Sequence, residues 1–119
     1  MPELLGPFLR ERREALRSER GRSYSLRQVA GRIGMEPSYL SRIERGTDIP
    51  PGEEKLLALA KELEVNPDAL LAMAGKVSAE VQAAVRKQPE LFGELIRQLN
   101  KMPDNALLKL VREVRDGDW

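Results

Sequence analysis

Two short helical patterns follow each other almost without a gap in the segment SLRQVAGRIGMEPSYLSRIERG, and start and stop signals define both. Ser25 and Gln28 have the spacing of a capping box, in which a hydroxyl oxygen accepts from a backbone N–H group and opens a helix. Gly34 follows the last apolar position of the first pattern, where a left-handed residue lets the chain turn sharply. Pro37 suits the first turn of the second helix, and Gly46 suits its end. The sequence therefore predicts two short helices joined by a tight turn.

The apolar residues of this segment predict that both helices bury one side. Their spacing fits two crossed helices with a small alanine at the contact, which is the arrangement of a helix-turn-helix. Gly34 then has a structural role, because it supplies the turn between the two helices. The apolar residues are Leu26, Val29, Ala30, Ile33, Met35, Leu40 and Ile43.

Helical periodicity continues on both sides of this segment, and no strand pattern is visible. Further helices are predicted over about residues 6–20, 52–63 and 66–75, and we expect Ile49 to anchor the loop before the second of these in the core. The residues of that helix that we expect to be buried are Leu56, Leu57, Ala60 and Leu63. We therefore predict an all-α fold, with a five-helix domain in residues 1–75 and a C-terminal segment of two or three helices in residues 76–119.

Composition limits the chemistry that the chain supports. The chain has no His and no Cys, and so lacks an imidazole base, a thiol nucleophile and the usual zinc ligands. It shows neither a phosphate-cradling glycine loop nor clustered carboxylates, so we expect no enzyme activity and no cofactor or metal. The N-terminus lacks the features of a signal peptide, and no apolar run approaches the ~20 residues of a membrane helix. We therefore expect a soluble cytoplasmic protein.

Charge is distributed unevenly along the chain. Residues 1–47 contain ten Arg, no Lys and six Glu, for a net charge of +4. Residues 48–119 contain ten basic and thirteen acidic side chains, for a net charge of −3. Arg offers phosphate and guanine a planar fork of donors, so the bias favours a polyanionic partner for the N-terminal part. A GC-rich genome accounts for part of the same bias.

The segment SLRQVAGRIGMEPSYLSRIERGTDIPPGEEKLLALAKELEVNPDALL resembles the Xre family of helix-turn-helix regulators, the type of the phage lambda Cro protein and repressor. The most specific parts of the match are VA followed by G at the turn, SYLSRIERG, a Pro after the loop, and LAKELEVNPDAL. The resemblance covers about residues 6–74. One departure is the connection LRSERGRSYS, which is longer than usual and either lengthens the first helix or forms a basic loop near DNA. Its Arg20 and Arg22 are then solvated charges or phosphate ligands.

The resemblance implies a five-helix, lambda-repressor-like DNA-binding domain whose third helix enters the major groove of double-stranded operator DNA. Carried over position by position, it assigns base contacts to three residues of this sequence. Arg42 is expected to bind O6 and N7 of a guanine, Tyr39 a thymine methyl group or a phosphate, and Ser38 a base or a phosphate. The alternative for Arg42 is a solvated side chain, and the alternative for Ser38 and Tyr39 is contact with the DNA backbone alone.

Phosphate contacts are expected from the start of the second helix, where backbone N–H groups are exposed, and from the loop after the third. The family pattern also pairs Arg13 in the first helix with Glu44 in the third. We expect this pair to orient the recognition helix and not to act in catalysis, because Arg stays protonated. The candidate phosphate-contacting residues are Ser25, Leu26, Arg27, Gln28, Arg45 and Thr47.

The apolar stripes after residue 76 allow two interpretations. They either fold back and enlarge the core of the monomer, or pair two copies of the chain. We favour a homodimer, because reading two half-sites about one DNA turn (~34 Å) apart requires a two-fold protein. Trp119 either caps that interface or frays. The candidate dimerisation residues are Leu91, Phe92, Leu95, Ile96, Leu99, Leu107, Val111 and Val114.

The sequence thus predicts a sequence-specific DNA-binding transcriptional regulator, a repressor that binds a pseudo-palindromic operator as a homodimer. The alternative is an antitoxin or adaptor whose C-terminal helices bind a regulatory protein partner, with autoregulatory DNA binding. A self-complementary apolar face favours the homodimer, whereas an unpaired exposed groove favours the partner. No membrane partner is expected.

Overall fold

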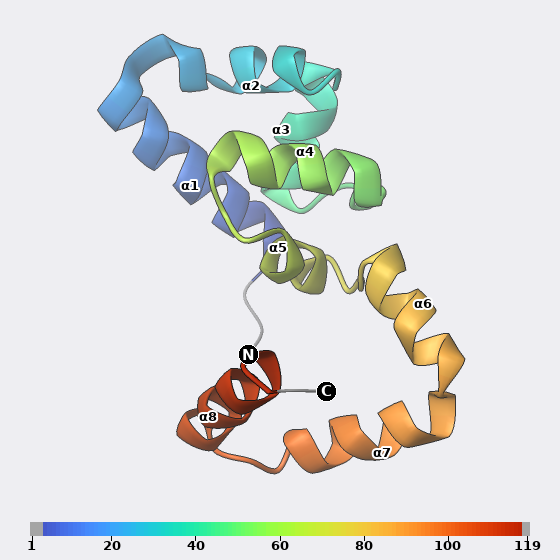
Figure 1. Cartoon of the computed structure of the whole chain (residues 1–119). Coiled ribbons are helices and arrows are strands. Elements are labelled where there is room, and N and C mark those ends of the chain that lie inside the picture. Colours follow the sequence, from blue (N-terminus) through green and yellow to red (C-terminus); the bar gives the residue numbers. More distant parts are fainter. Residues whose placement is uncertain (1–3, 118–119) are drawn as a thin grey trace. The chain divides into compact units, whose positions relative to one another are not determined.

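The computed structural model describes residues 4–117, and all regular secondary structure in that range is helical. The predicted all-α fold is confirmed. The chain divides into two compact units, Met1–Ser78 and Ala79–Trp119. Trp119, a candidate for the C-terminal interface, lies outside the described residues. The elements of the first unit (Figure 1) are α1 (Leu5–Arg20), the 3₁₀ helix η1 (Gly21–Tyr24), α2 (Leu26–Arg32), α3 (Pro37–Arg45), α4 (Glu53–Leu63) and α5 (Pro67–Met73).

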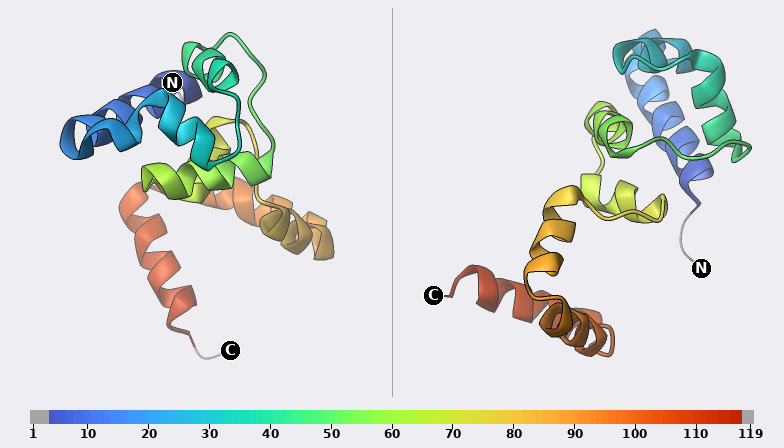
Figure 2. Two further views of the ribbon diagram at one scale, coloured as in Figure 1. Left: turned by 90° about the horizontal axis from the view of Figure 1, so that it is seen from above. Right: turned by 90° about the vertical axis from the view of Figure 1, so that its right-hand side faces the viewer.

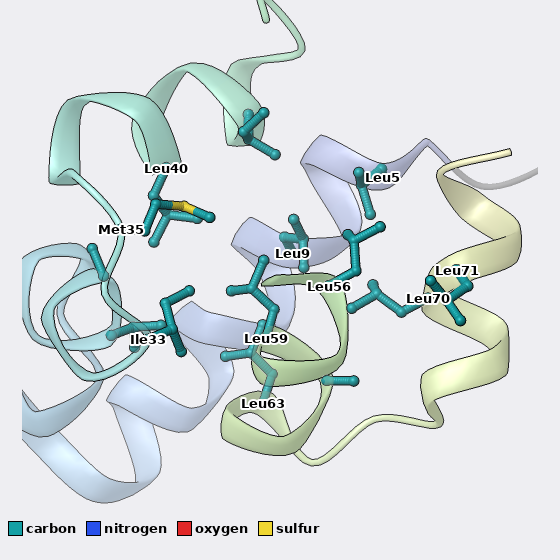
Figure 3. Packing of buried hydrophobic residues seen from close by; sticks show 14 of the residues in the cluster. Leu5, Leu9, Ile33, Met35, Leu40, Leu56, Leu59, Leu63, Leu70 and Leu71 are labelled. Carbon is teal, nitrogen blue, oxygen red and sulfur yellow. The ribbon is translucent and has the colours of Figure 1, made fainter. Parts of the chain in front are cut away.

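The first unit is built around one hydrophobic core. Figure 3 shows leucines of α1, α4 and α5 converging there, with Ile33, Met35 and Leu40 approaching from the α2–α3 side. Burying such a side chain contributes about 1.5–3 kcal/mol relative to leaving it in water. The core therefore holds α2 and α3 on a scaffold made by the other three helices. Its members are Leu5, Leu9, Leu16, Val29, Ala30, Ile33, Met35, Leu40, Ile43, Leu56, Leu59, Ala60, Leu63, Leu70 and Leu71.

The ends of α2 and α3 lie where the sequence signals placed them. The Oγ atom of Ser25 accepts the backbone N–H of Gln28 at 3.2 Å, which caps α2. Pro37 occupies the first turn of α3, and Gly46 ends this helix with a left-handed φ of 73°. Local signals were sufficient here because each of them acts within about one helical turn.

The turn between α2 and α3 is tight and is held from two sides. Gly34 adopts a left-handed φ of 68°, as predicted, and the N–H of Met35 donates to the carbonyl of Ala30 at 2.8 Å. The Nζ atom of Lys55, on α4, donates to the carbonyls of Ile33 at 2.8 Å and Gly34 at 3.2 Å. A lysine from a distant helix thus satisfies the carbonyl groups at the end of α2.

The long connection between α1 and α2 consists of the last turn of α1, which ends at Arg20, and of η1. The Tyr24 ring centre lies 5.7 Å from the guanidinium of Arg20 and 5.2 Å from that of Arg32. Nη2 of Arg20 also donates to Oε1 of Glu64, just after α4, at 3.1 Å. This bond raises the pKa of Arg20 and lowers that of Glu64. Both arginines are exposed, but Arg20 is bound to Glu64 and Tyr24 on the protein surface, whereas Arg22 is the second arginine of this connection.

Two predictions of burial are wrong. Ile49 does not anchor its loop, because its side chain is 79% exposed, and the buried residue of the loop is Pro51. On α4, Leu57 is 38% exposed and Leu59 is fully buried. Positions 56, 59, 60 and 63 follow the i, i+3, i+4, i+7 spacing of one helical face, which places Leu59 inward and Leu57 outward.

The second unit consists of three helices that follow one another along the chain (Figure 2). No described residue of these helices is buried. Several of their large apolar side chains, such as Leu91 at 66% and Val111 at 57%, are mostly exposed. Among residues 4–117, no helix combines the length and apolarity needed to cross a membrane. The three helices are α6 (Ala79–Lys87), α7 (Pro89–Leu99) and α8 (Asp104–Arg115).

Candidate nucleic-acid interface

Helix α3 has a buried face and an outward face. Its buried residues are Leu40, Ile43 and Glu44, and the helix packs against both α1 and α2. Ser38 is exposed and Arg42 is partly exposed, and their spacing of four residues places them on the same side of the helix. The outward face therefore consists of polar side chains on a helix whose other face is anchored in the core.

A buried ion pair joins α3 to α1. Nε and Nη2 of Arg13 donate to the two carboxylate oxygens of Glu44 at 2.7 and 3.0 Å, and both side chains are nearly inaccessible to solvent. Nη1 of Arg13 donates to the carbonyl of Tyr24 at 3.3 Å. The bonds to Glu44 raise the pKa of Arg13, against the opposing effect of burial. The pair implied by the family pattern is thus present, with a bidentate geometry that joins α3 to α1.

A close backbone approach between the same two helices was not predicted. A Cβ atom on Gly6 of α1 would lie only 2.6 Å from the carbonyl oxygens of Ile43 and Glu44. Those atoms belong to the backbone of α3 and cannot move aside independently. Gly6 is therefore required for α1 to lie directly against α3. A glycine among the first apolar residues of a helix was the available signal, because glycine weakens a helix unless packing needs it.

Arg42 and Tyr39 are connected to the loop that follows α3. Nε of Arg42 donates to Oδ2 of Asp48 at 2.8 Å, and Oδ1 of Asp48 accepts the backbone N–H of Ile49 at 2.7 Å. These bonds lower the pKa of the Asp48 carboxyl group. The hydroxyl of Tyr39 donates to the carbonyl of Ile49 at 2.8 Å, and the Arg42 guanidinium lies 5.8 Å from the Tyr39 ring centre. Asp48, which the sequence did not single out, thus contacts the principal candidate for base recognition.

Tyr39 is also partly packed against the core. Its ring is therefore held by the core on one side and by the bond from its hydroxyl on the other. Of the three candidate base-contacting residues, Ser38 alone has its side chain fully outward, whereas Tyr39 and Arg42 have defined partners within the chain. The site thus offers two oriented side chains and one exposed hydroxyl.

Two of the six candidate phosphate-contacting residues line one shallow depression between α1, the start of α2 and α3. Leu26 and Arg45 meet there with Arg10 and Arg13, around a volume of about 280 Å³. Arg10 was not predicted, and it pairs with Glu14 on the exposed surface of α1 at 3.3 Å. The depression therefore adds an exposed arginine of α1 to the cationic groups near α3.

The other four candidates lie outside this depression. Arg27 and Gln28 are exposed in the first turn of α2, directly after the partly buried capping residue Ser25. The Thr47 hydroxyl donates to the carbonyl of Arg42 at 3.3 Å and so helps to end α3. Ser25 and Thr47 thus have local roles at helix ends, while Arg27 and Gln28 face solvent.

All candidate dimerisation residues except Leu91 line two apolar hollows of the second unit. One, of about 430 Å³, lies between α7 and α8, and its apolar lining includes Leu107, Val111 and Val114. The other, of about 360 Å³, lies between α6 and α7 and includes Phe92 and Ile96. Leu95 and Leu99 belong to both hollows, and Leu91 lines a smaller one beside them. Leu110, Val81 and Val85, which line the same two hollows, were not among the candidates.

Comparison with known proteins gives a family match and shows similarity to two mycobacterial proteins. The model of the family described as "Helix-turn-helix domain" matches residues 4–73. Two proteins of Mycobacterium tuberculosis are each 35% identical to the chain over 81 residues, which are 68% of this chain and 53% of each relative. They are named uncharacterized HTH-type transcriptional regulators, MT0491 of strain CDC 1551 and Rv0474 of strain H37Rv. The chain thus spans about half the length of these relatives. No solved structure matches it significantly.

Proposed function

The chain belongs to a family of helix-turn-helix domains, and we propose that it is a transcriptional regulator that binds a specific DNA sequence. The observation that supports this most is the state of α3. The helix is anchored by buried apolar residues and by a bidentate ion pair to α1, and it leaves Ser38 and Arg42 outward. A rigid helix with polar groups outward suits the major groove, which admits an α-helix.

We assign base contacts to Arg42, Tyr39 and Ser38. Arg42 binds a guanine through O6 and N7, Tyr39 packs on a thymine methyl group or donates to a phosphate, and Ser38 binds a base or a phosphate. We assign Arg13, Glu44 and Gly34 to the support of this helix. The arrangement supports a place in the Xre, lambda Cro and repressor-like group of helix-turn-helix proteins.

We propose that residues next to α3 contact the phosphates of the DNA. Arg27 and Gln28 contribute side chains from α2, and Arg45 and Thr47 contribute them from the end of α3. The backbone N–H group of Leu26 adds to these, whereas that of Ser25 donates to the carbonyl of Arg22 at 2.9 Å. Such contacts position the protein on the duplex without carrying sequence information. Because each neutralised phosphate releases counterions, we expect affinity to fall steeply with salt.

We propose further that the chain acts as a homodimeric repressor in the cytoplasm, without enzymatic activity or a cofactor. The first unit, residues 1–75 in the predicted division, binds DNA, and residues 76–119 pair two copies. Exposed apolar hollows in the second unit support this, because contiguous apolar surface rimmed by polar residues marks interaction sites. Two copies on a pseudo-palindromic operator would block a promoter.

The same hollows support a second candidate function. In an antitoxin or adaptor they would receive a regulatory protein partner, and DNA binding would be autoregulatory. Sedimentation of the full chain separates the two, because the first requires a concentration-dependent dimer. A chain truncated after Ser78 should then be monomeric and should bind its operator more weakly than the full chain.

Selection from a random pool of DNA duplexes tests the proposal as a whole. The full chain should enrich a palindromic sequence that contains a guanine in each half-site. Arg42→Ala should reduce the preference for that guanine by ~1–3 kcal/mol, because the bidentate bond is lost. Arg17→Ala, which removes an exposed arginine of α1, serves as the matched control. Absence of any enriched sequence would contradict specific binding, and an unchanged preference in Arg42→Ala would exclude the base contact.

A further inference from the structure

The Arg42 guanidinium has one edge bound to the following loop and one edge that faces away from it. Nε, on the inner edge, donates to Asp48. Within residues 4–117, Nη1 and Nη2 donate no hydrogen bond, and 43% of the side chain is exposed. The two terminal nitrogen atoms are the pair that can bind O6 and N7 of one guanine together. The intramolecular bond therefore leaves the base-reading edge available.

Asp48 is itself held in place. Its second oxygen accepts the N–H of Ile49, whose carbonyl accepts the hydroxyl of Tyr39. The backbone N–H of Thr47 donates to the carbonyl of Arg42 at 2.9 Å, which fixes the start of the same loop on the end of α3. Helix and loop are thus connected at three points, and the carboxylate has a defined position relative to the arginine that it binds.

We propose that Asp48 is a positioning residue for base recognition: by holding Nε, it presents Nη1 and Nη2 of Arg42 to a single guanine. This inference rests on the proposed function. A free arginine side chain has many rotamers and also reaches phosphates, so its contacts carry little sequence information. An arginine held at Nε loses less entropy when it binds the base, and reaches fewer alternative partners.

Because Asp48 is negatively charged, its role in positioning Arg42 can be distinguished from a general contribution to DNA affinity. A carboxylate beside a recognition helix repels the phosphate backbone, which lowers affinity for unrelated DNA. Its effect on the correct sequence is the opposite, because it directs the arginine. Asp48 therefore lowers non-specific affinity and raises discrimination, which is the behaviour of a specificity-determining residue.

The test compares Asp48→Asn with the original chain on two duplexes, the operator selected from a random pool and the same operator with its guanine pair replaced. The ratio of the two dissociation constants measures discrimination. We expect Asp48→Asn to reduce this ratio about two- to tenfold, as the loss of a charged hydrogen bond implies. Binding to unrelated DNA should tighten, and the slope of log K against log salt should steepen by about one, because the released arginine reaches a phosphate.

Three further variants make the result specific. Asp48→Glu keeps the charge and should give a ratio between those of Asp48→Asn and the original chain. Glu62→Gln removes a carboxylate from an arginine pair of the same length, 2.8 Å to Arg32 on α2, and should leave the ratio unchanged. In an Arg42→Ala background, Asp48→Asn should have no effect on the ratio, because the side chain that it positions is gone.

The failure of this inference differs from the failure of the proposed function. If Arg42→Ala abolishes the guanine preference while Asp48→Asn leaves it intact or increases it, the positioning role is wrong and the DNA-reading function stands. An effect of Asp48→Asn that persists in the Arg42→Ala background would also overturn the role. If the original chain selects no sequence, both the function and the inference fail.

Discussion

The two units of this chain contain similar amphipathic helices, but the apolar faces are buried in the first unit and exposed in the second. In the first unit, the apolar stripes of five helices face one another and form a single closed core. In the second, α7 and α8 carry stripes that are more pronounced than those of α1 and α4, yet no described residue of α6–α8 is buried. An amphipathic stripe thus predicts a helix with one apolar face, but it does not specify what covers that face. We infer that the stability of the chain resides mainly in the closed core of the first unit.

The largest effect on stability is expected when the buried ion pair of the first unit is broken. Glu44→Ala should lower the free energy of unfolding by ~3–5 kcal/mol, because it leaves the buried Arg13 guanidinium without its partner. Urea unfolding followed by circular dichroism measures the change. Glu62→Ala breaks a partly exposed pair and should cost only ~0–1 kcal/mol. Similar losses in the two variants would show that the buried pair has no special role in holding α3.

A slightly smaller effect on stability is expected from Leu59 of α4, with Leu57 of the same helix as its control. Leu59→Ala should cost ~2–5 kcal/mol, because it opens a cavity in the closed core. Leu57→Ala, on the exposed side of the same helix, should change stability by within ~0.5 kcal/mol. Denaturant midpoints of both variants test the assignment of the inner face. The assignment is wrong if Leu57→Ala proves the more damaging change.

Substitutions in the second unit should change the affinity of the proposed dimer. Val111→Asp places a charge in the hollow between α7 and α8 and should weaken the proposed dimer at least tenfold, or ~1.4 kcal/mol. Leu108→Asp introduces the same charge on α8 outside that hollow and is the matched control. Sedimentation at several concentrations measures the dissociation constant. Equal weakening by both variants would place the interface elsewhere on α8.

The smallest effect on stability is expected from lowering the pH. The carboxyl groups of Asp48 and Glu64 have pKa values below their ordinary 3.8 and 4.5, because Arg42 and Arg20 donate to the ionised forms. The unfolded chain therefore binds more protons than the folded chain near these values, so stability falls as pH decreases from about 5. Both groups are open to solvent, which screens the effect, so the loss should be slight. Thermal unfolding between pH 3 and 7 should show a shallower decline in Glu64→Gln; an unchanged slope would exclude Glu64 as a source.

Much of the fold was predictable because its signals are local. Gly34 and Gly46 adopt the left-handed conformations expected of them, and Ser25 and Pro37 open the helices that they were expected to open. The choice of Leu57 over Leu59 was an avoidable error, since the heptad-like spacing on α4 contained the answer. These features depend on residues within a few positions of one another, where backbone sterics and helical periodicity suffice.

The candidate site was predictable only as far as the recognition helix and its ion pair. Asp48 lies six positions after Arg42 and beyond a helix end, and no periodic rule connects such positions. Gly6 is separated by more than thirty residues from the α3 carbonyls that it touches. Lys55 likewise reaches the end of α2 from another helix. Each of these contacts exists because helices dock at particular angles, which the sequence pattern does not contain.

By itself, therefore, the sequence determined that this protein is helical, where its helices begin and end, and that two of them form a helix-turn-helix. Those properties follow from capping, turn conformation and apolar spacing, which act along the chain. Only the tertiary structure decided that α1 touches the backbone of α3, that Asp48 holds Arg42, and that the apolar faces of α6–α8 remain exposed. Those properties depend on which surfaces meet in three dimensions, and an amphipathic pattern is the same whether its apolar face is covered or open.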